Sequence, residues 1–295
     1  MIRLGWVIWW LGMAGAVAAP VQVTDDAGLV VRLRAPAKRI VSLAPHVTEL
    51  IFAAGAGDRL VAVSAYSDFP PEAAKLPQVA DYNSLAIERI VALKPDLVVA
   101  WQSGSAPRQV AKLVELGIPI FWSQPSRLAG VADSIEAMGI LADTQVAAKA
   151  AALTYRQKLT ELSGLYRQRE SIAVFYPIWD KPLTTINQMH LISDVIHLCG
   201  GRNVFGRLVS LTPLVSSESV LAADPEVILE AGRSHGEPSV WGRWPTMRAV
   251  RYRNLFSISS SLISRPSPRV LDGAVQVCHL LDQARQHRRI VRKQR

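Results

Sequence analysis

Short, continuously apolar runs alternate with helical patterns along most of the chain. Residues 21–33 are typical of a hairpin, in which an Asp/Gly turn separates two alternating runs. Buried strands are then predicted at 39–43, 60–63, 96–100 and 118–122, with helices at 46–54, 87–93, 108–116 and 128–141. Apolar strands separated by helices indicate a parallel sheet covered on both faces.

A segment without strand character follows at 143–170. Asp143 is the expected N-cap, and the apolar positions beyond it have helical spacing. The α/β pattern then resumes, with strands at 171–176, 227–229 and 255–258 and helices at 190–198 and 268–285. The predicted fold is therefore α/β, with lobes at 20–142 and 171–285, each around a central parallel sheet, joined by one long helix.

An internal repeat supports two related lobes. Residues 88–99 align without gaps to residues 218–229. Each copy begins a short helix at a glutamate, Glu88 or Glu218, and has a proline seven residues later before a buried strand. Helix–proline–strand units recur in α/β proteins, but a glutamate at the same offset in both copies favours a common origin. Either glutamate also suits the first turn of a helix, where the macrodipole favours negative charge.

Composition excludes a disordered chain, since 49% of the 295 residues are apolar and 19% are charged. The formal charge of +9 is concentrated at the ends of the chain. Six positive residues lie from Arg285 onward and Arg3 adds a seventh, so the remainder carries +2. We interpret residues 286–295 as a disordered basic tail, not as a nucleic-acid-binding face.

The N-terminus predicts export. Arg3 precedes an uncharged run of 15 residues that ends in Ala16-Val17-Ala18-Ala19, the pattern of a signal peptide at 1–19. A retained membrane anchor is the alternative, but the run is short of the about 20 residues that a spanning helix needs. In an oxidising compartment Cys199 and Cys278 favour one disulfide, with two buried thiols as the alternative.

Motifs of catalysis are missing from the sequence. It contains no G-x-S-x-G, Walker A, H-E-x-x-H or complete dinucleotide fingerprint, and its six histidines have no metal-ligand spacing. His46 follows a predicted strand at the end where α/β sheets bind ligands, so it is considered as a metal or cofactor ligand. A packing role is the favoured interpretation of this histidine.

Aromatic residues at strand ends are more informative. Tyr66, Tyr82 and Trp101 follow strands of the first lobe, and Trp179 follows a strand of the second. Core packing would explain any one of them. Four at strand ends of two lobes favour a cleft for a large, partly planar ligand. An exported two-lobed protein of this kind is best interpreted as the solute-binding component of an importer.

Several blocks of sequence resemble the periplasmic vitamin B12-binding proteins of ABC importers. They are Arg39-Ile40-Val41-Ser42-Leu43-Ala44-Pro45 with Thr48-Glu49-Leu50, Tyr66-Ser67-Asp68-Phe69-Pro70-Pro71, residues 88–98, Cys199-Gly200-Gly201-Arg202-Asn203-Val204-Phe205 and Ser267-Pro268-Arg269. The resemblance runs from about Arg39 to about Asp282. Tyr66 to Pro71 is particular to the cobalamin branch, whereas other blocks are shared with iron-siderophore and haem binders.

This resemblance implies a class III periplasmic-binding-protein fold with a rigid connecting helix, and a corrin held in the cleft with slight closure. Cobalamin is then a transported ligand, with no cofactor, no bound metal and no enzyme activity. By position, ligand contacts fall on Tyr66, Tyr82, Trp101, Ser261 and Arg265. Cys199 and Cys278 match the family disulfide, and Glu88 and Glu218 match glutamates that dock onto a permease dimer at the inner membrane.

Departures from the family pattern fall in the second lobe. Thr184 and Thr212 stand where aromatic residues are expected, and Ser261 replaces an acidic contact. Trp179 is a candidate to compensate. Alternatives are a haem or iron-siderophore binder that uses His46, an exported hydrolase, and an interaction protein that uses the basic tail.

Overall fold

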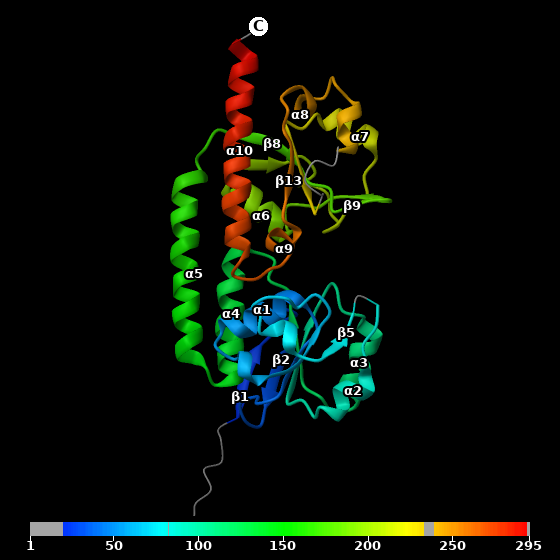
Figure 1. Ribbon diagram of the computed structural model, residues 1–295, viewed down its shortest axis with the longest axis vertical. Helices are drawn as coiled ribbons and strands as arrows, with labels where there is room; N and C mark the ends of the chain where they lie inside the picture. Colours follow the sequence, from blue (N-terminus) through cyan, green and yellow to red (C-terminus); the bar gives the residue numbers. More distant parts are fainter. Residues whose placement is uncertain (1–19, 82, 233–238, 294–295) are drawn as a thin grey trace, which may run out of the picture.

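Two parallel sheets form the frame of the computed structural model, which describes residues 20–81, 83–232 and 239–293 (Figure 1). The N-terminal sheet has the order β5 (Gln78–Ala80), β4 (Leu60–Ser64), β3 (Ile40–Ser42), β6 (Leu97–Trp101), β7 (Ile120–Ser123). The C-terminal sheet has the order β11 (Gly201–Asn203), β8 (Ile172–Phe175), β12 (Val227–Ala231), β13 (Leu255–Ile258). Every neighbouring pair in both sheets is parallel, as the apolar strands predict.

Two antiparallel hairpins stand outside these sheets. One is the predicted N-terminal hairpin, β1 (Val21–Thr24) with β2 (Val30–Leu33). The other, β9 (Trp179–Asp180) with β10 (Leu183–Thr184), follows the first strand of the C-terminal lobe and was not predicted.

Helices cover both faces of each sheet. They are α1 (Pro45–Ala53), α2 (Ile87–Ala92), α3 (Pro107–Glu115), α4 (Leu128–Ala142), α5 (Gln145–Tyr166), α6 (Leu191–Leu198), α7 (Ser217–Ala223), α8 (Arg248–Arg251), α9 (Ser260–Ile263) and α10 (Val270–Lys293). Along β6, Leu97 and Val99 pack with α1 and α4, whereas Val98 and Ala100 pack with α2 and α3. This alternation follows from the period of two along a strand.

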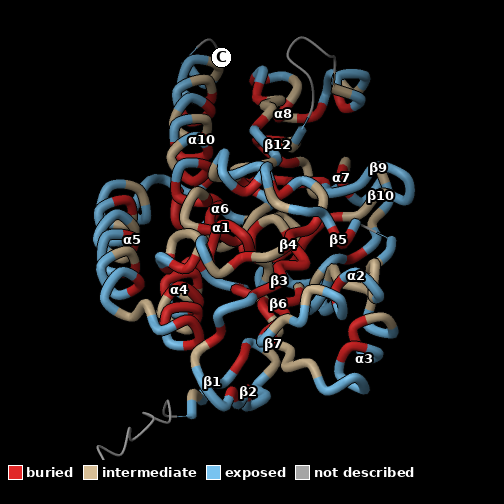
Figure 2. The backbone as a smooth tube through the Cα atoms, turned by 60° about the horizontal axis from the view of Figure 1, so that its bottom comes forward, coloured by how far each residue is buried: buried red, intermediate tan, exposed pale blue. Residues whose placement is uncertain are grey.

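One hydrophobic core runs through both lobes. Val47 and Leu50 of α1, Val174 of β8, and Val277 of α10 belong to one buried cluster, to which α4 and α5 also contribute. Figure 2 shows buried residues along the inward sides of these helices in both halves of the molecule. The lobes are therefore packed against each other along the helix side and are not joined by a linker alone.

The long connection consists of a helix shorter than predicted. Asp143 does not cap it: Asp143 ends α4 in the left-handed conformation, with φ of 58°. The chain turns back there, and α5 starts at Gln145, packed against α4. Thr144 uses its hydroxyl to donate to the Ala54 carbonyl at 2.7 Å. This left-handed turn, which short polar residues such as Asp tolerate, separates α4 from α5, so the connecting helix begins two residues later than predicted and ends at Tyr166.

The internal repeat corresponds to equivalent elements. α2 precedes β6 in the first lobe, and α7 precedes β12 in the second. The residue before the repeat's proline has a positive φ in both copies, 48° at Lys94 and 39° at Asp224. Both strands lie inside their sheets, beside β3 and β8 respectively. The same turn therefore leads each copy from helix to strand.

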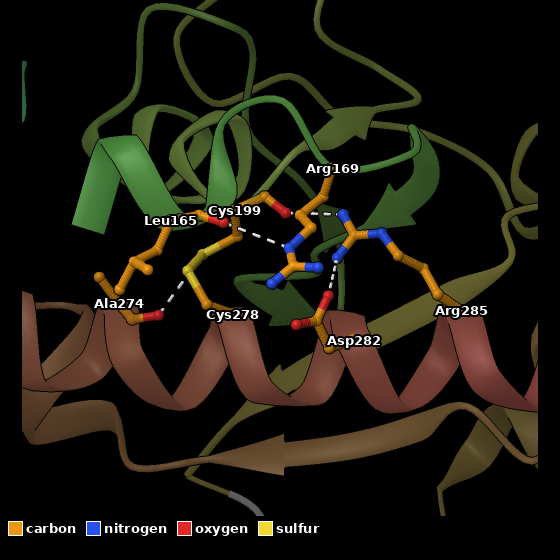
Figure 3. Close-up of a disulfide and its surroundings, with 7 residues drawn as sticks. All are labelled: Leu165, Arg169, Cys199, Ala274, Cys278, Asp282 and Arg285. Atoms are coloured by element: carbon orange, nitrogen blue, oxygen red, sulfur yellow. Dashed lines mark hydrogen bonds and ion pairs between the residues drawn. A yellow bond between two sulfur atoms is a disulfide. The ribbon is translucent and has the colours of Figure 1, made fainter. Parts of the chain in front are cut away.

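The predicted disulfide is present between Cys199 and Cys278 (Figure 3). Cys199 caps the end of α6, and Cys278 lies in α10, so the bond joins two helices of the C-terminal lobe. Both residues are fully buried. A cross-link between positions 79 apart removes conformational freedom mainly from the unfolded chain.

The prediction of a disordered tail is wrong for residues 286–293, because α10 continues to Lys293. Arg285 is buried and donates to the Cys199 carbonyl at 2.7 Å and to Asp282 at 2.6 Å (Figure 3). Arg288 is buried beside Glu226, 3.1 Å away. Acceptors from distant parts of the chain therefore hold these cations in the fold.

No helix in the described ranges is both long and apolar enough to cross a membrane. The predicted signal peptide at 1–19 lies outside these ranges.

Candidate ligand-binding site

The carboxyl ends of both sheets meet at the boundary between the lobes (Figure 1). Tyr66 follows β4, and Trp101 is the last residue of β6. In the other lobe, β13 leads through α9 to Arg265, which reaches Glu49 of the N-terminal lobe. Open α/β sheets bind ligands beyond the carboxyl ends of their strands. The candidate site is therefore the cleft at this boundary.

Tyr66 stands on a loop anchored by buried hydroxyl groups. Thr48 Oγ1 lies 2.8 Å from Ser42 Oγ and 3.0 Å from Ser67 Oγ. Ser67 Oγ lies in turn 3.2 Å from Ser64 Oγ. Tyr66 has a φ of 62°, an uncommon backbone conformation for an aromatic residue. The residue is 77% exposed, so this turn presents its ring to solvent.

Trp101 is half-buried, and neighbouring residues restrict its ring and its backbone. Its ring meets the edge of His46, with centroids 5.5 Å apart and planes at 78°. Its backbone N–H donates to Ser105 Oγ at 3.0 Å. A Cβ at Gly104 would lie 1.9 Å from the indole, so only glycine leaves room for the ring. The local sequence therefore holds one aromatic face at the strand end.

A small cavity of about 40 Å³ lies beside Trp101 where the lobes meet. It is lined by Trp101, Gln124, Pro125, Ser126, Met189, His190, Leu191, Ile192, Leu211, Ile263, Ser264 and Pro266. A space of this size accommodates water, not a large ligand. We therefore interpret it as the packed floor of the cleft.

A buried carboxylate joins the lobes at the cleft. Glu49 of α1 is 3% exposed and accepts hydrogen bonds from three residues of the C-terminal lobe. Ser267 Oγ is 2.6 Å away, Arg265 Nη1 2.9 Å and Arg269 Nη1 3.4 Å. Two guanidinium groups and a hydroxyl offset the cost of burying this charge. The family resemblance includes Glu49, but sequence reasoning assigned it no role, because its partners lie more than 200 positions away.

The predicted ligand contact Arg265 also reaches the loop of Tyr66. Its guanidinium lies 2.6 Å from an Asp68 carboxylate oxygen and donates to the Tyr66 carbonyl at 3.0 Å. The hydrogen bond from Arg265 lowers the pKa of Asp68, which is an exposed group. Arg265 thus links the C-terminal lobe to the segment that presents Tyr66.

Trp179 lies in the β9–β10 hairpin of the C-terminal lobe. The residue is 66% exposed, and its Nε1 donates to the Lys181 carbonyl at 3.0 Å. Thr184 of the same hairpin forms an isolated bridge with Leu214, which is 67% exposed. Leu214 is therefore an additional candidate for an apolar ligand contact from the C-terminal lobe. Its only sequence signal was its place near Thr212, one of the positions that depart from the family pattern.

Ser261 is half-buried in α9 next to the interlobe cavity. Its hydroxyl lies 2.9 Å from Ser259 Oγ, whereas Ile263 and Ser264 line the cavity. Tyr82 lies outside the described residues.

His46 is a buried packing residue in the structure. Burial, with a smaller contribution from the positive charge of Arg265, lowers its pKa to about 3. Its Nε2 is buried and has no hydrogen-bond partner in the described part of the chain. No group of three or more histidine, cysteine or acidic side chains capable of holding a metal ion is found among residues 20–81, 83–232 and 239–293.

Glu88 and Glu218 are exposed and occupy the first turns of α2 and α7. In Figure 1 these helices lie in different lobes, on the side opposite α5 and α10. Hydrogen bonds from its own backbone N–H and from the Ser216 hydroxyl lower the pKa of Glu218. One glutamate therefore stands on each lobe, on the same side of the molecule.

Two parallel sheets that face each other across a cleft, backed by long helices, define a class of two-lobed binding proteins. The family model for periplasmic binding proteins matches residues 40–260. The chain belongs to this family, whose members are binding proteins and not enzymes.

Within the family, the chain is similar to vitamin B12-binding proteins. It is 42% identical over 247 residues to that of Vibrio cholerae, covering 83% of this chain and 90% of the relative. It is 38% identical over 242 residues to that of Yersinia pestis, covering 82% and 85%. The crystal structure of the Vibrio cholerae periplasmic vitamin B12-binding protein matches with a TM-score of 0.80 and 41% identity, over 85% of this chain and 98% of that one.

A haem-binding protein of Vibrio cholerae has the same fold. Its structure matches with a TM-score of 0.71 and 23% identity, over 82% of this chain and 98% of that one. At this identity the likeness concerns the fold alone.

Proposed function

We propose that this protein captures cobalamin in the interlobe cleft and delivers it to an ABC permease. The observation that carries the proposal is the fixed aromatic face of Trp101, opposite a second lobe, in a chain 42% identical to a vitamin B12-binding protein. Flat rings at a cleft edged by polar groups suit a large, partly planar ligand.

Both lobes would contact the corrin. Tyr66 and Trp101 supply apolar faces from the N-terminal lobe, and Trp179 supplies one from the β9–β10 hairpin. We expect Arg265 and Ser261 to supply hydrogen bonds to corrin amides. Cobalt would receive no ligand from His46, whose ring packs edge-on with Trp101 and whose Nε2 is buried. This burial favours cobalamin over a haem bound through His46.

Only slight closure on the ligand is expected. The shared hydrophobic core and the hydrogen bonds to Glu49 both join the lobes. Opening the cleft would break the hydrogen bonds of Glu49 and expose part of the shared apolar core to water. The cleft is therefore largely formed before the ligand arrives.

Calorimetric titration with cyanocobalamin tests the proposal. We expect saturable binding by the mature chain, and a loss of about 1 to 3 kcal/mol in Tyr66→Ala and in Trp101→Ala, the scale of removing a buried aromatic contact. Tyr166→Ala is the matched control, because its ring lies on α5 against His279. This control should bind as tightly as the unaltered protein.

Two outcomes would overturn the assignment. Unchanged affinity in both Tyr66→Ala and Trp101→Ala would remove the aromatic site. A parallel spectroscopic titration with haem that saturates, while cyanocobalamin does not bind, would favour the haem alternative.

The place of action we propose is the periplasm, after cleavage of the predicted signal peptide at 1–19. Glu88 and Glu218 would dock the loaded protein onto the two halves of a permease dimer at the inner membrane. Two anionic contacts on the same side of the molecule suit a two-fold receptor.

A further inference from the structure

A second cavity lies in the C-terminal lobe, away from the aromatic residues of the cleft. It measures about 1080 Å³ and is formed where the start of α4, the end of α5, the helix α6 and the edge strand β11 come together. None of Tyr66, Trp101 and Trp179 lines it. We call it the arginine cavity, because Arg127, Arg167, Arg169, Arg202 and Arg207 line it.

The positive charge of this cavity is largely uncompensated. Asp194 is the single acidic residue of its lining, and it already accepts the Leu128 N–H at 2.8 Å. Arg127 approaches Asp194 only to 3.8 Å. Within the described ranges, Arg202 and Arg207 form no ion pair and both are exposed.

This arrangement changes the interpretation of the chain's net charge. From the sequence we placed most of the excess positive charge at the C-terminal end of the chain. In the structure, however, Arg285 and Arg288 of that segment are buried in ion pairs with Asp282 and Glu226. The arginine cavity, in contrast, collects cations from the start of α4, the end of α5, and β11 with the loop that follows it. Such a surface attracts anions. An anion bound there would lie within a Debye length of several guanidinium groups, so salt would screen their attraction only partly.

Phosphate is the anionic group that this lining fits. A guanidinium donates two parallel hydrogen bonds to phosphate oxygens, and it remains charged at any physiological pH. Cavities of about 300 to 1,000 Å³ hold ligands of drug size, so this one has room for more than a single phosphate. Several arginines around one space favour a ligand with clustered charges.

We propose that the arginine cavity binds an anion that carries two or more phosphate groups, from a soluble polyphosphate or from clustered phospholipid headgroups. Met189 lines both this cavity and the small cavity beside Trp101, so the two sites adjoin. None of the five arginines lines the small cavity, and the proposal does not depend on cobalamin binding.

Titration of the full mature chain with inorganic pyrophosphate at physiological ionic strength tests the proposal. We expect saturable binding with one site per chain. The double variant Arg202→Gln/Arg207→Gln should weaken it at least tenfold, because it removes two unpaired cations of the lining. The matched control is Arg292→Gln/Lys293→Gln, which removes the same charge from the exposed end of α10 and should stay within twofold.

Equal weakening in both double variants would overturn the site, since it would mean general attraction by net charge. Absence of saturable pyrophosphate binding by the unaltered chain, together with no retention on phosphatidylglycerol vesicles, would also overturn it. Retention on those vesicles but not on phosphatidylcholine, lost in Arg202→Gln/Arg207→Gln, assigns the phosphates to lipid. Pyrophosphate binding without retention assigns them to a soluble anion.

Unfolding midpoints would verify that both double variants fold. Cyanocobalamin titration of Arg202→Gln/Arg207→Gln should match that of the unaltered chain. A failure of the cobalamin proposal would therefore appear in a different titration from a failure of this one.

Discussion

His46 shows how one buried side chain couples the stability of the fold to pH. It is neutral in the folded protein, since burial and then the charge of Arg265 lower its pKa from 6.5 to about 3. The unfolded chain takes up a proton on this residue below about pH 6.5. The unfolded state thus binds more protons between these pKa values, and the stability that His46 contributes above pH 6.5 is lost as the pH falls toward 3.

We predict that His46→Phe flattens the pH dependence of the free energy of unfolding. Phenylalanine keeps a buried ring beside Trp101 and cannot take up a proton. Between pH 7 and pH 5 the unaltered protein should lose about 1 to 2 kcal/mol more than the variant. Urea unfolding at both pH values measures this difference. Burial also lowers the pKa of His190, to about 4. This residue is present in both proteins, so its contribution to the pH dependence cancels in the comparison. Equal losses would contradict the prediction.

The helix α10 shows how a charged sequence becomes part of the core. Glu226 precedes β12 and is buried, and Arg288 of α10 places Nη1 3.1 and 3.3 Å from its two carboxylate oxygens. Arg288 also donates to the Ser171 carbonyl at 3.1 Å. The end of α10 thereby closes the edge of the C-terminal lobe at which the strands begin.

We expect Arg288→Ala to destabilise the protein by about 3 kcal/mol, because it leaves the buried Glu226 carboxylate without its nearest cation. Arg292→Ala, an exposed change on the same helix, should alter stability by less than about 0.5 kcal/mol. Guanidinium unfolding of the two variants makes the comparison. Similar small effects in both would mean that this part of α10 contributes nothing to the fold.

Deleting the chain from Arg285 onward should likewise destabilise the protein.

The whole molecule is a two-lobed body whose faces have different chemistry. The boundary between the lobes carries Trp101, the side with α2 and α7 presents a glutamate on each lobe, and the arginine cavity opens beside α6 and β11. Since the lobes are tied by a shared core and by Glu49, the two glutamates keep a nearly fixed separation. A fixed separation is what docking onto a two-fold partner requires.

We predict that Glu88→Lys/Glu218→Lys leaves cyanocobalamin affinity unchanged and abolishes uptake through the cognate permease. Both residues are exposed, so reversal should not disturb folding. Glu115→Lys/Glu161→Lys changes the net charge equally at other exposed positions and should transport normally. Uptake into vesicles containing the permease provides the measurement. Normal uptake by the first double variant would remove the docking role.

The sequence alone determined most of the framework. Apolar runs identified nearly all strands of both sheets, and the glutamate–proline repeat placed α2 with β6 and α7 with β12. These features are local, because burial on both faces of a strand requires apolar residues within the strand itself. The short strands β5 and β11 and the β9–β10 hairpin escaped prediction. Strands β5 (Gln-Val-Ala) and β11 (Gly-Arg-Asn) contain polar residues and so form no continuous apolar run, and the two strands of the hairpin have only two residues each.

Tertiary structure alone decided how charges are used. Nothing near Glu49 in the sequence indicates Arg265, and nothing near Arg288 indicates Glu226, because each pair is joined only when distant elements pack. The left-handed conformation of Asp143 and the gathering of five arginines around one cavity also depend on how distant elements pack. Local pattern determines which segments become strands and helices, whereas burial of a charge depends on the partner that the fold brings to it.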